Sequence, residues 1–373
     1  MPLAVRLRSL QFLLVFALAF GLAGCGGGST SSTTSTQPAT LGETVDAVAK
    51  TAMLQQHIPG MTVALGKSGQ LLYVGAYGVS DTGTSQATQP GTIFEIGSIT
   101  KQFTAALIMQ LQERGKLNVD DSIDLYLSEY AFPPVITLRM LLTHTSGLPN
   151  YTTFPQINGW SLGGVSESTV LTAISQTPLD FPPGTQWSYS NSNYFLLGAI
   201  IEKVTGQTYE ANLQQHIFQP LGLTNTYYSL PPVAQSATGY MSDGSVATLA
   251  NRSASFAAGA LSSNVFDLIA WDNALIHGKV VSPASFTAMT TSSGFTMPGG
   301  GTYGFGLAMR TFNNRPVIWH NGAIWGFTAE TEVFLDSGFS VVVLTNSFGA
   351  NPDIVVNQVI NSVCNSEQLS SNC

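Results

Sequence analysis

A serine and a lysine stand three residues apart where a short apolar run ends and a predicted helix begins. Ser98 and Lys101 follow Gly97, and segment 105–111 reads as a buried helix. If the helix begins near Ser98, the two side chains lie one turn apart on one face, beside unpaired first-turn N–H groups. A serine nucleophile needs a neighbour that lowers the cost of its alkoxide and donors for the later anion. The pair therefore indicates covalent catalysis, although many solvated helix starts share this composition and partners elsewhere must decide.

A second set of polar side chains lies in segment 187–191, after a Pro-Gly turn and before another predicted helix. In an extended chain, Tyr189 and Asn191 point to the same side. A phenol can accept the proton of a serine where nearby cations lower its pKa, and Asn191 can orient Lys101 or a substrate carbonyl. The alternative is a tyrosine that lines the core and an asparagine that caps a helix.

A third set, His320-Asn321-Gly322, ends a predicted strand. His320 and Gly322 share a face, and the missing side chain of Gly322 lets a ligand approach the backbone. The N–H groups of Ala323 and Ser98 are then candidates for an oxyanion hole. The alternative for His320 is a partly buried, hydrogen-bonded histidine at the end of a strand.

Ser-x-x-Lys, Tyr-x-Asn and His-x-Gly occur in this order, and with them the chain resembles the serine β-lactamase and penicillin-binding-protein superfamily. The resemblance extends over roughly residues 43–363 and looks strongest to the class C β-lactamase-like hydrolases, which include esterases and D-amino-acid peptidases. It is carried by segments 96–104, 141–148, 183–191, 220–223, 303–307 and 320–322.

The resemblance implies a role for each of these residues. Ser98 would be the acylated nucleophile, and Lys101 and Tyr189 would share the general-base role, with the choice between them left open. Asn191 would orient the substrate and His320 would line the pocket. Dedicated class C β-lactamases carry Lys-Thr-Gly where this chain has His-Asn-Gly. Neutral histidine is a weaker site for a carboxylate than the permanent cation of a lysine.

We therefore expect a serine hydrolase that forms a covalent acyl-enzyme with an ester, amide or lactam carbonyl of a small-molecule or peptide substrate. The histidine at position 320 favours an esterase or a D-amino-acid peptidase or carboxypeptidase, with a true β-lactamase as the alternative. The alternative from another class is a non-catalytic lipoprotein that binds peptidoglycan or penicillin. No cofactor is expected, and the histidine and cysteine spacings predict no metal site.

Hydrophobic patterning predicts an α/β (α+β) fold built from both ends of the chain, as in the β-lactamase-like proteins that it resembles. We expect helices at 41–56 and 353–363, a hairpin of strands 61–65 and 70–77, and strands at 303–309, 317–320, 328–335 and 340–345. Short turns imply an antiparallel sheet, of about five or more strands flanked by helices. The α/β part would comprise about 43–115 and 264–363, with a mainly α part, about 116–263, inserted as an all-α domain. Residues 150–165 are predicted to form a loop, and a cleft between the two parts is the default ligand site.

The N-terminus has the order of an export signal: two arginines, the apolar segment 10–20 and then small residues. It ends in Leu-Ala-Gly before Cys25, which resembles the bacterial lipobox. The expectation is a lipoprotein signal peptide at 1–24, a lipid on Cys25 that anchors the protein to a membrane, and a flexible Gly/Ser/Thr tether at 25–42. The protein would face the periplasm, and the glycine after Cys25 resembles the lipoproteins that are sorted to the outer rather than the inner membrane. The alternative is ordinary cleavage with Cys25 as a free thiol.

Two further cysteines, Cys364 and Cys373, lie in the predicted C-terminal tail 364–373. Export to an oxidising space makes a disulfide between them plausible, and two unpaired thiols are the alternative. The chain has a net charge of −8 and no basic stripe, which argues against a nucleic-acid partner. The oligomeric state stays open.

Four other features look less informative. The Gly-x-Ser-x-Gly pattern around Ser161 lacks the strand before it and the helix after it that a nucleophile elbow needs. His144 lies in a turn that ends a predicted helix, where a structural role, bonded to backbone, fits better than catalysis. Tyr151 and Trp325 fit the pocket wall and the core equally well.

Overall fold

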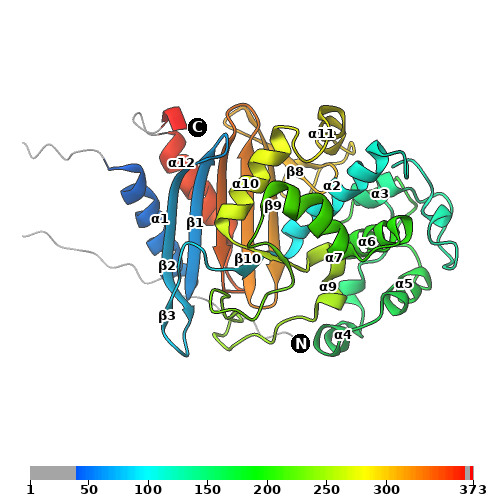
Figure 1. Ribbon diagram of the computed structural model, residues 1–373, viewed down its shortest axis with the longest axis horizontal. Helices are drawn as coiled ribbons and strands as arrows, with labels where there is room; N and C mark the ends of the chain where they lie inside the picture. The colour runs from blue at the N-terminus through cyan, green and yellow to red at the C-terminus, as the bar shows by residue number, and fades with distance from the viewer. Residues whose placement is uncertain (1–38, 366–369, 373) are drawn as a thin grey trace, which may run out of the picture. The chain divides into compact units, whose positions relative to one another are not determined.

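One eight-stranded antiparallel sheet organises the described part of the chain, residues 39–365 and 370–372 of the computed structural model. Its strands are β1 (Gly60–Lys67), β2 (Gln70–Asp81), β3 (Gln86–Ala87), β7 (Thr302–Tyr303), β8 (Ala308–Phe312), β9 (Arg315–Ile324), β10 (Phe327–Phe334) and β11 (Phe339–Thr345). They lie in the order β3-β2-β1-β11-β10-β9-β8-β7, which places the blue N-terminal strands beside the orange C-terminal ones (Figure 1). β1 pairs with β11 from Met61↔Thr345 to Lys67↔Phe339. The predicted antiparallel sheet built from both ends of the chain is therefore confirmed.

Helices from the two ends of the sequence, α1 (Leu41–Gln56) and α12 (Pro352–Cys364), cover one face of this sheet (Figure 1). Alternate residues of β1 point to this side: Val63 packs among their apolar side chains, whereas Ala64 faces the opposite core. The start of α1 is set by a capping box, in which the Thr40 hydroxyl accepts the N–H of Glu43 and the Glu43 carboxylate accepts the N–H of Thr40. The helix thus begins inside the predicted tether, so residues 41 and 42 are helical.

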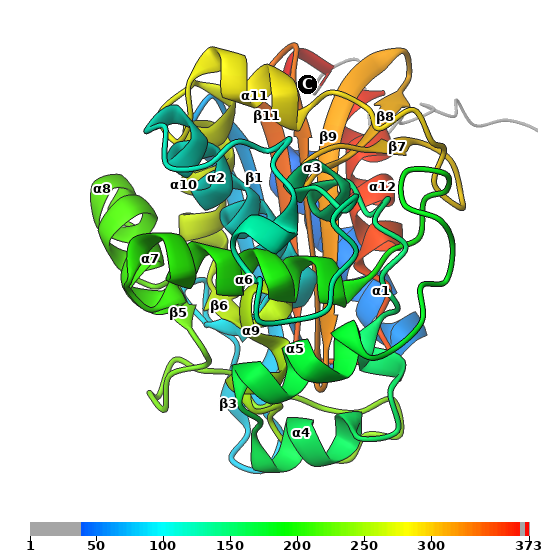
Figure 2. The ribbon, with the colours of Figure 1, turned by 90° about the vertical axis from the view of Figure 1, so that its right-hand side faces the viewer.

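The other face of the sheet carries the thicker helical layer (Figures 1 and 2). Its elements and the short turns of the described chain are η1 (Gly97–Ile99), α2 (Thr100–Glu113), η2 (Ile123–Leu125), α3 (Leu138–Leu142), η3 (Tyr151–Thr153), α4 (Ile157–Gly163), α5 (Glu167–Ser175), α6 (Asn191–Thr205), α7 (Tyr209–Leu213), the π-helical η4 (Gln214–Phe218), α8 (Gln219–Leu221), α9 (Arg252–Gly259), α10 (Val265–Ile276), α11 (Pro283–Met289) and η5 (Ser370–Asn372). A second, small sheet has the order β4-β6-β5, with β4 (Phe94–Glu95), β5 (Tyr227–Tyr228) and β6 (Leu261–Ser263).

The helix that follows Ser98, α2, is buried on all sides over residues 100–109. Phe103 stacks on Trp271 of α10 with ring centroids 3.8 Å apart, and the Trp271 indole N–H donates to Gln102 Oε1 over 2.8 Å. A helix that is buried all round belongs to the centre of a core. α2 therefore gives the site a rigid axis around which the other elements are placed.

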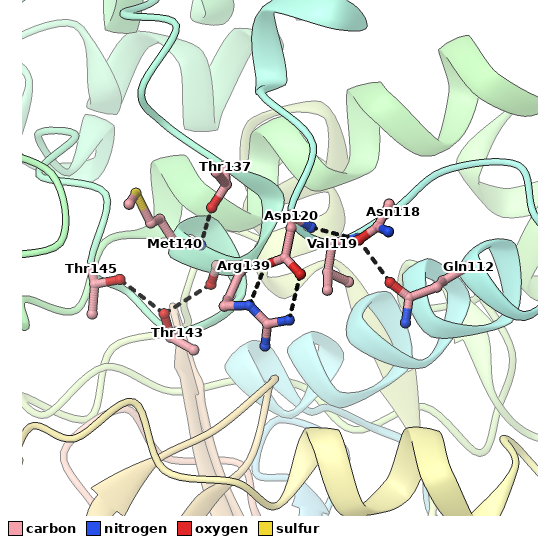
Figure 3. Close-up of polar contacts among 9 residues, drawn as sticks. All are labelled: Gln112, Asn118, Val119, Asp120, Thr137, Arg139, Met140, Thr143 and Thr145. Atoms are coloured by element: carbon pink, nitrogen blue, oxygen red, sulfur yellow. Dashed lines mark hydrogen bonds and ion pairs between the residues drawn. The ribbon is translucent and has the colours of Figure 1, made fainter.

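A chain of polar contacts links the end of α2 to α3 (Figure 3). The Val119 N–H donates to Gln112 Oε1 over 2.8 Å, and the Arg139 guanidinium forms two hydrogen bonds, of 2.6 and 3.0 Å, to the Asp120 carboxylate. From α3 the bonds continue through the Thr143 hydroxyl, which donates to Arg139 O over 2.8 Å. The turn that follows α3 is thereby fixed relative to α2, the helix that follows the serine.

Three predictions about the elements were wrong. The expected strand 303–309 is divided between β7 and β8, because Gly304–Leu307 form a tight turn in which Gly306 has φ +71°. A Cβ at Gly306 would lie 2.6 Å from Lys101 O, so this turn packs directly on the first turn of α2. The expected loop 150–165 contains η3 and α4, and β9 continues past His320 to Ile324.

Several sequence predictions fall outside the described residues: the signal peptide 1–24, Cys25, the tether up to residue 38, and Cys373. Cys364 takes part in a disulfide, and its pairing with Cys373 stays a prediction. In the part of the chain that the structure describes, no helix combines the length and the apolar character needed to cross a membrane.

Candidate active site

Ser98 lies on η1, a single 3-10 turn that runs directly into α2. Gly97, with φ +49°, allows the chain to turn from β4 into η1. The turn is held by Thr100, whose hydroxyl donates to Gly97 O over 2.7 Å and accepts the Leu261 N–H over 3.1 Å. The serine is thus fixed at a helix start, as its spacing from Lys101 requires.

Lys101 is fully buried and its ammonium nitrogen meets three polar groups. Nζ lies 3.1 Å from Ser98 Oγ, 2.8 Å from Asn191 Oδ1 and 2.6 Å from Ala258 O. Among the described residues no carboxylate pairs with it, and burial lowers the pKa of Lys101 well below its usual value. A neutral amine has two N–H donors and one lone pair. Asn191 Oδ1 and Ala258 O only accept hydrogen bonds, whereas the Ser98 hydroxyl accepts one from Nζ and can donate one to a neutral amine.

Tyr189 lies beside this pair with its ring centre 4.9 Å from Lys101 Nζ. Its hydroxyl is buried and forms no hydrogen bond within the described residues. Burial raises the pKa of Tyr189, and the neighbouring Ser98 hydroxyl offsets only part of that rise. The direction is opposite to the one that a tyrosine base, activated by nearby cations, would show.

The backbone on both sides of Tyr189 is held by His144, which is buried and has φ +59°. The carbonyl of His144 accepts the Ser188 N–H over 3.0 Å, and its Nδ1 accepts the Ser190 N–H over 3.2 Å. The imidazole also packs against the Tyr189 ring, with centroids 4.4 Å apart. The structural role predicted for His144, bonded to backbone, is confirmed.

Asn191 is the first residue of α6 rather than part of an extended stretch, and Ser190 is the residue before the helix. Its Nδ2 lies 3.4 Å from Asn150 Oδ1 and 3.3 Å from Thr152 Oγ1, which turns Oδ1 toward Lys101. The prediction that Tyr189 and Asn191 share one side of an extended stretch was therefore wrong. The helix start nevertheless brings Asn191 to the Ser98 site.

His320 lies inside β9 and is buried, with both ring nitrogens occupied. Nδ1 is 2.6 Å from Asn321 O, so it carries the proton, and Nε2 accepts the Tyr303 hydroxyl over 2.9 Å. Burial is the main cause that lowers the pKa of His320, to about 3, and Lys101 adds to the effect when it carries its charge. The imidazole is therefore neutral at neutral pH and offers no cation to a carboxylate.

The sheet edge touches the backbone of the serine turn at two glycines. A Cβ at Gly322 would lie 1.9 Å from Ile96 O, and a Cβ at Gly97 would lie 2.8 Å from the nitrogen of Ala323. Real side chains do not approach backbone so closely, so these positions admit only glycine without a shift. The contact brings the backbones of Ser98 and Ala323 to the same site, as the predicted oxyanion hole requires. The role itself stays a prediction.

Two pockets meet at Ser98, which lines both of them together with Asn191 and Ala323. Volumes of about 360 and 400 Å³ fall in the usual range of small-molecule sites, ~300–1,000 Å³. The first, which we call the α4–α9 pocket, is also lined by Tyr151, Thr152, Ile157, Asn158, Ser161, Ala250, Ala254, Ser255, Ala258, Gly259, Ile324, Trp325 and Phe348. The second, which we call the aromatic pocket, is also lined by Trp187, Tyr189, Met297, Pro298, Tyr303, Ala308, Trp319, His320 and Asn321. Tyr151 and Trp325, left open by the sequence, thus line the α4–α9 pocket.

Some functional positions could not be found from the sequence. Ala258 acts through a backbone carbonyl, and Asn150 acts by orienting another side chain, so neither has a residue-type signal. Tyr303 stood inside a segment that carried the resemblance, but nothing in that segment showed its bond to His320.

Ser161 lies in α4, which rules out a nucleophile elbow there. Within residues 39–365 and 370–372, no group of three His, Cys, Asp or Glu side chains is placed to hold a metal ion.

This fold and this site define a serine hydrolase of the β-lactamase-like superfamily. The β-lactamase family matches residues 45–363, and the chain belongs to that family.

Relatives within this superfamily carry several names. A protein of Bacillus subtilis (strain 168), PbpX, named for penicillin binding, is 31% identical over 314 residues that cover 82% of this chain and 75% of PbpX. The octameric penicillin-binding protein homologue from Pyrococcus abyssi has a TM-score of 0.77 at 27% identity, covering 86% of this chain and 77% of that one. A D-stereospecific amidohydrolase from Streptomyces sp. has a TM-score of 0.76 at 26% identity, covering 87% and 98%.

The contact between Gly322 and Ile96 yields a prediction about the nucleophile. Gly322→Ala should push β9 away from η1 and slow covalent labelling of Ser98 by a fluorophosphonate by about 10²-fold or more, because a misplaced oxyanion donor costs that much. Gly91→Ala is the matched control, since a Cβ there meets nothing within 4 Å. Labelling rates and thermal unfolding are measured for both. An unchanged labelling rate in Gly322→Ala would contradict the close contact.

Proposed function

We propose that this chain cleaves an ester or amide bond through an acyl-enzyme on Ser98, as an esterase or a D-amino-acid peptidase-like enzyme. One observation carries the proposal. Lys101 is buried without a carboxylate among the described residues, and two of its three neighbours, Asn191 Oδ1 and Ala258 O, only accept hydrogen bonds. In the neutral amine that burial favours, the one lone pair is left for the hydroxyl of Ser98, 3.1 Å away.

In the acylation step that we propose, Ser98 Oγ bonds to the substrate carbonyl carbon while its proton passes to Lys101 Nζ. The carbonyl oxygen becomes an anion that accepts the N–H groups of Ser98 and Ala323. Burial favours the neutral amine before the step, so the lysine is available as a base near neutral pH. The new charge on Nζ is then stabilised by the same two carbonyl oxygens.

Tyr189 supplies the proton for the leaving group. Because burial raises its pKa, the phenol keeps its proton until the bond to the leaving group breaks, and then gives that proton to the departing oxygen or nitrogen. Lys101 returns the proton taken from Ser98 to Tyr189, so both groups regain their starting states. A water molecule then attacks the acyl-enzyme and gives one proton to Lys101, which passes it to Ser98 Oγ as the acid leaves.

Two findings support an ester or amide over a β-lactam. His320 is neutral and bonded at both nitrogens, whereas a β-lactam carries a carboxylate that a cation would recognise. The similar Streptomyces structure is named a D-stereospecific amidohydrolase, which is amide chemistry on this fold. A true β-lactamase is the less supported alternative.

The proposal is tested by covalent labelling and by turnover. The wild-type protein should gain the mass of one fluorophosphonate adduct and hydrolyse p-nitrophenyl butyrate faster than a cephalosporin. Ser98→Ala should do neither, while Ser161→Ala, which changes the serine of the Gly-x-Ser-x-Gly pattern, should still be labelled. If no adduct forms and no ester, amide or lactam is hydrolysed, the protein is a binding protein rather than an enzyme.

The base is tested by Lys101→Arg, which keeps a cation but cannot lose its proton near neutral pH. Its kcat should fall by about 10²–10⁴-fold, the usual worth of general-base assistance. Lys203→Arg, on a surface lysine 3.0 Å from Glu129, should keep wild-type activity. Since only the deprotonated lysine acts as base and burial lowers its pKa, the wild-type rate should rise with pH and level off below the usual range of lysine. Full activity in Lys101→Arg would remove Lys101 as the base.

We also propose that the protein is a lipoprotein held to the membrane through Cys25 and facing the periplasm. The two arginines, the apolar segment 10–20 and the Leu-Ala-Gly-Cys sequence support this. In bacteria supplied with labelled palmitate, the protein should take up label and sediment with membranes. Cys25→Ser should do neither, and Cys364→Ser should behave as the wild type. Label retained by Cys25→Ser would refute the anchor.

A further inference from the structure

The walls of the site are uncharged on both sides of Ser98. In the α4–α9 pocket and the aromatic pocket, the described lining residues include no aspartate, glutamate, lysine or arginine. An enzyme that binds a free amino or carboxyl terminus needs a charged side chain in its pocket, and this lining has none. It bears directly on which substrates fit.

The position of the proton donor indicates which pocket holds the leaving group and which holds the acyl group, and this step rests on the proposed function. Tyr189 lines the aromatic pocket and is absent from the described lining of the α4–α9 pocket. The leaving group has to lie beside the residue that protonates it, so it occupies the aromatic pocket. The acyl group, on the other side of the scissile bond, occupies the α4–α9 pocket.

The acyl side is walled by small and neutral residues. Ala254 and Ala258, on either side of the kink at Phe256 in α9, both line this pocket with short side chains. The polar wall residues Asn158 and Ser161 are neutral. Phe348, also in the wall, is 38% exposed. A charged acyl group would lose its water here without gaining a partner.

The leaving-group side is walled by aromatic rings. Trp187, Tyr303 and Trp319 line it, and His320 is neutral and bonded to Tyr303. A cation does lie near: the Arg310 guanidinium carbon is 5.4 Å from the Trp319 ring centre. That arginine is already paired with the buried carboxylate of Glu332, so its charge is compensated.

From these walls we infer that the site takes a substrate without an ion on the acyl side and without an anion on the leaving-group side. It would be an ester or amide whose acyl part carries no free ammonium or carboxylate and whose leaving group carries no free carboxylate. The physical reason is that an ion moved from water into an uncharged, partly closed pocket loses solvation that nothing replaces. Free amino-acid amides and peptides with a free C-terminus are then poor substrates, and blocked ones are good.

Two ester series on the wild-type protein test this at neutral pH. The acyl series consists of the p-nitrophenyl esters of butyrate, of γ-trimethylammoniobutyrate and of glutarate, the last of which retains a free carboxylate. In the leaving-group series, butyrate is held constant while phenol, meta-trimethylammoniophenol or meta-carboxyphenol leaves. The neutral member of the acyl series should have a kcat/KM about tenfold or more above both charged members, and the phenyl ester should exceed the carboxyphenyl ester by the same factor, a difference that one uncompensated charge readily produces. The cationic leaving group should lose less, because the aromatic walls supply cation–π contacts.

Two variants, each of which adds one charge to one pocket, test which pocket holds the acyl group and which holds the leaving group. Asn158→Asp should raise kcat/KM for the cationic acyl ester by about threefold or more, by Coulomb attraction, and leave the leaving-group preference unchanged. Asn321→Lys should do the same for the carboxyphenyl ester alone. Asn313→Asp, at the exposed β8–β9 turn, adds the same charge as Asn158→Asp away from both pockets and should alter neither series.

The outcomes separate this inference from the proposed function. Charged and neutral esters hydrolysed equally fast, with Ser98 still labelled, would overturn the neutral-substrate inference and leave the acyl-enzyme standing. An effect of Asn158→Asp on the leaving-group series would overturn the assignment of the pockets. Failure to hydrolyse every ester, with no label on Ser98, would instead overturn the proposed function on which the inference rests.

Discussion

The site depends on the burial of one lysine. A lysine taken out of water favours its neutral form, because a buried charge without a partner is costly. Burial lowers the pKa of Lys101, and its Nζ is positioned by groups from three places: Ser98 on η1, Asn191 at the start of α6 and the carbonyl of Ala258 on α9. The helical layer and the burial of α2 therefore serve one purpose, which is to keep water and counter-charges away from this amine.

Close backbone contacts at glycine hold the sheet and the helices together around that lysine. Gly322 meets Ile96, Gly97 meets Ala323, and Gly306 meets the carbonyl of Lys101 itself. Each contact leaves no room for a Cβ, so the distance between β9, the β7–β8 turn and α2 is set by backbone rather than by adjustable side chains. Such contacts position the reacting groups more rigidly than side-chain packing alone.

The electrostatics of the site follow the same principle of keeping charges out or paired. His320 is neutral chiefly because it is buried, and this outweighs its bond to Asn321 O, which favours the charged form. Arg310, near the aromatic pocket, is paired with Glu332. The chain as a whole carries a net charge of −8, yet the two pockets at Ser98 are lined by uncharged residues in the described part of the chain. This described lining therefore offers an ionic group in either pocket no ion pair.

The sequence by itself determined the class of protein, the sheet assembled from both ends, and the residues Ser98, Lys101, Tyr189 and His320 as candidates. Local spacing and hydrophobic periodicity carry that information, because side chains repeat on one face every 3.6 residues in a helix and every two residues in a strand. Only the tertiary structure decided what those residues are chemically. The lowered pKa of Lys101 and the raised pKa of Tyr189 arise from burial by elements distant in sequence, and the carbonyl of Ala258 has no side-chain signal at all.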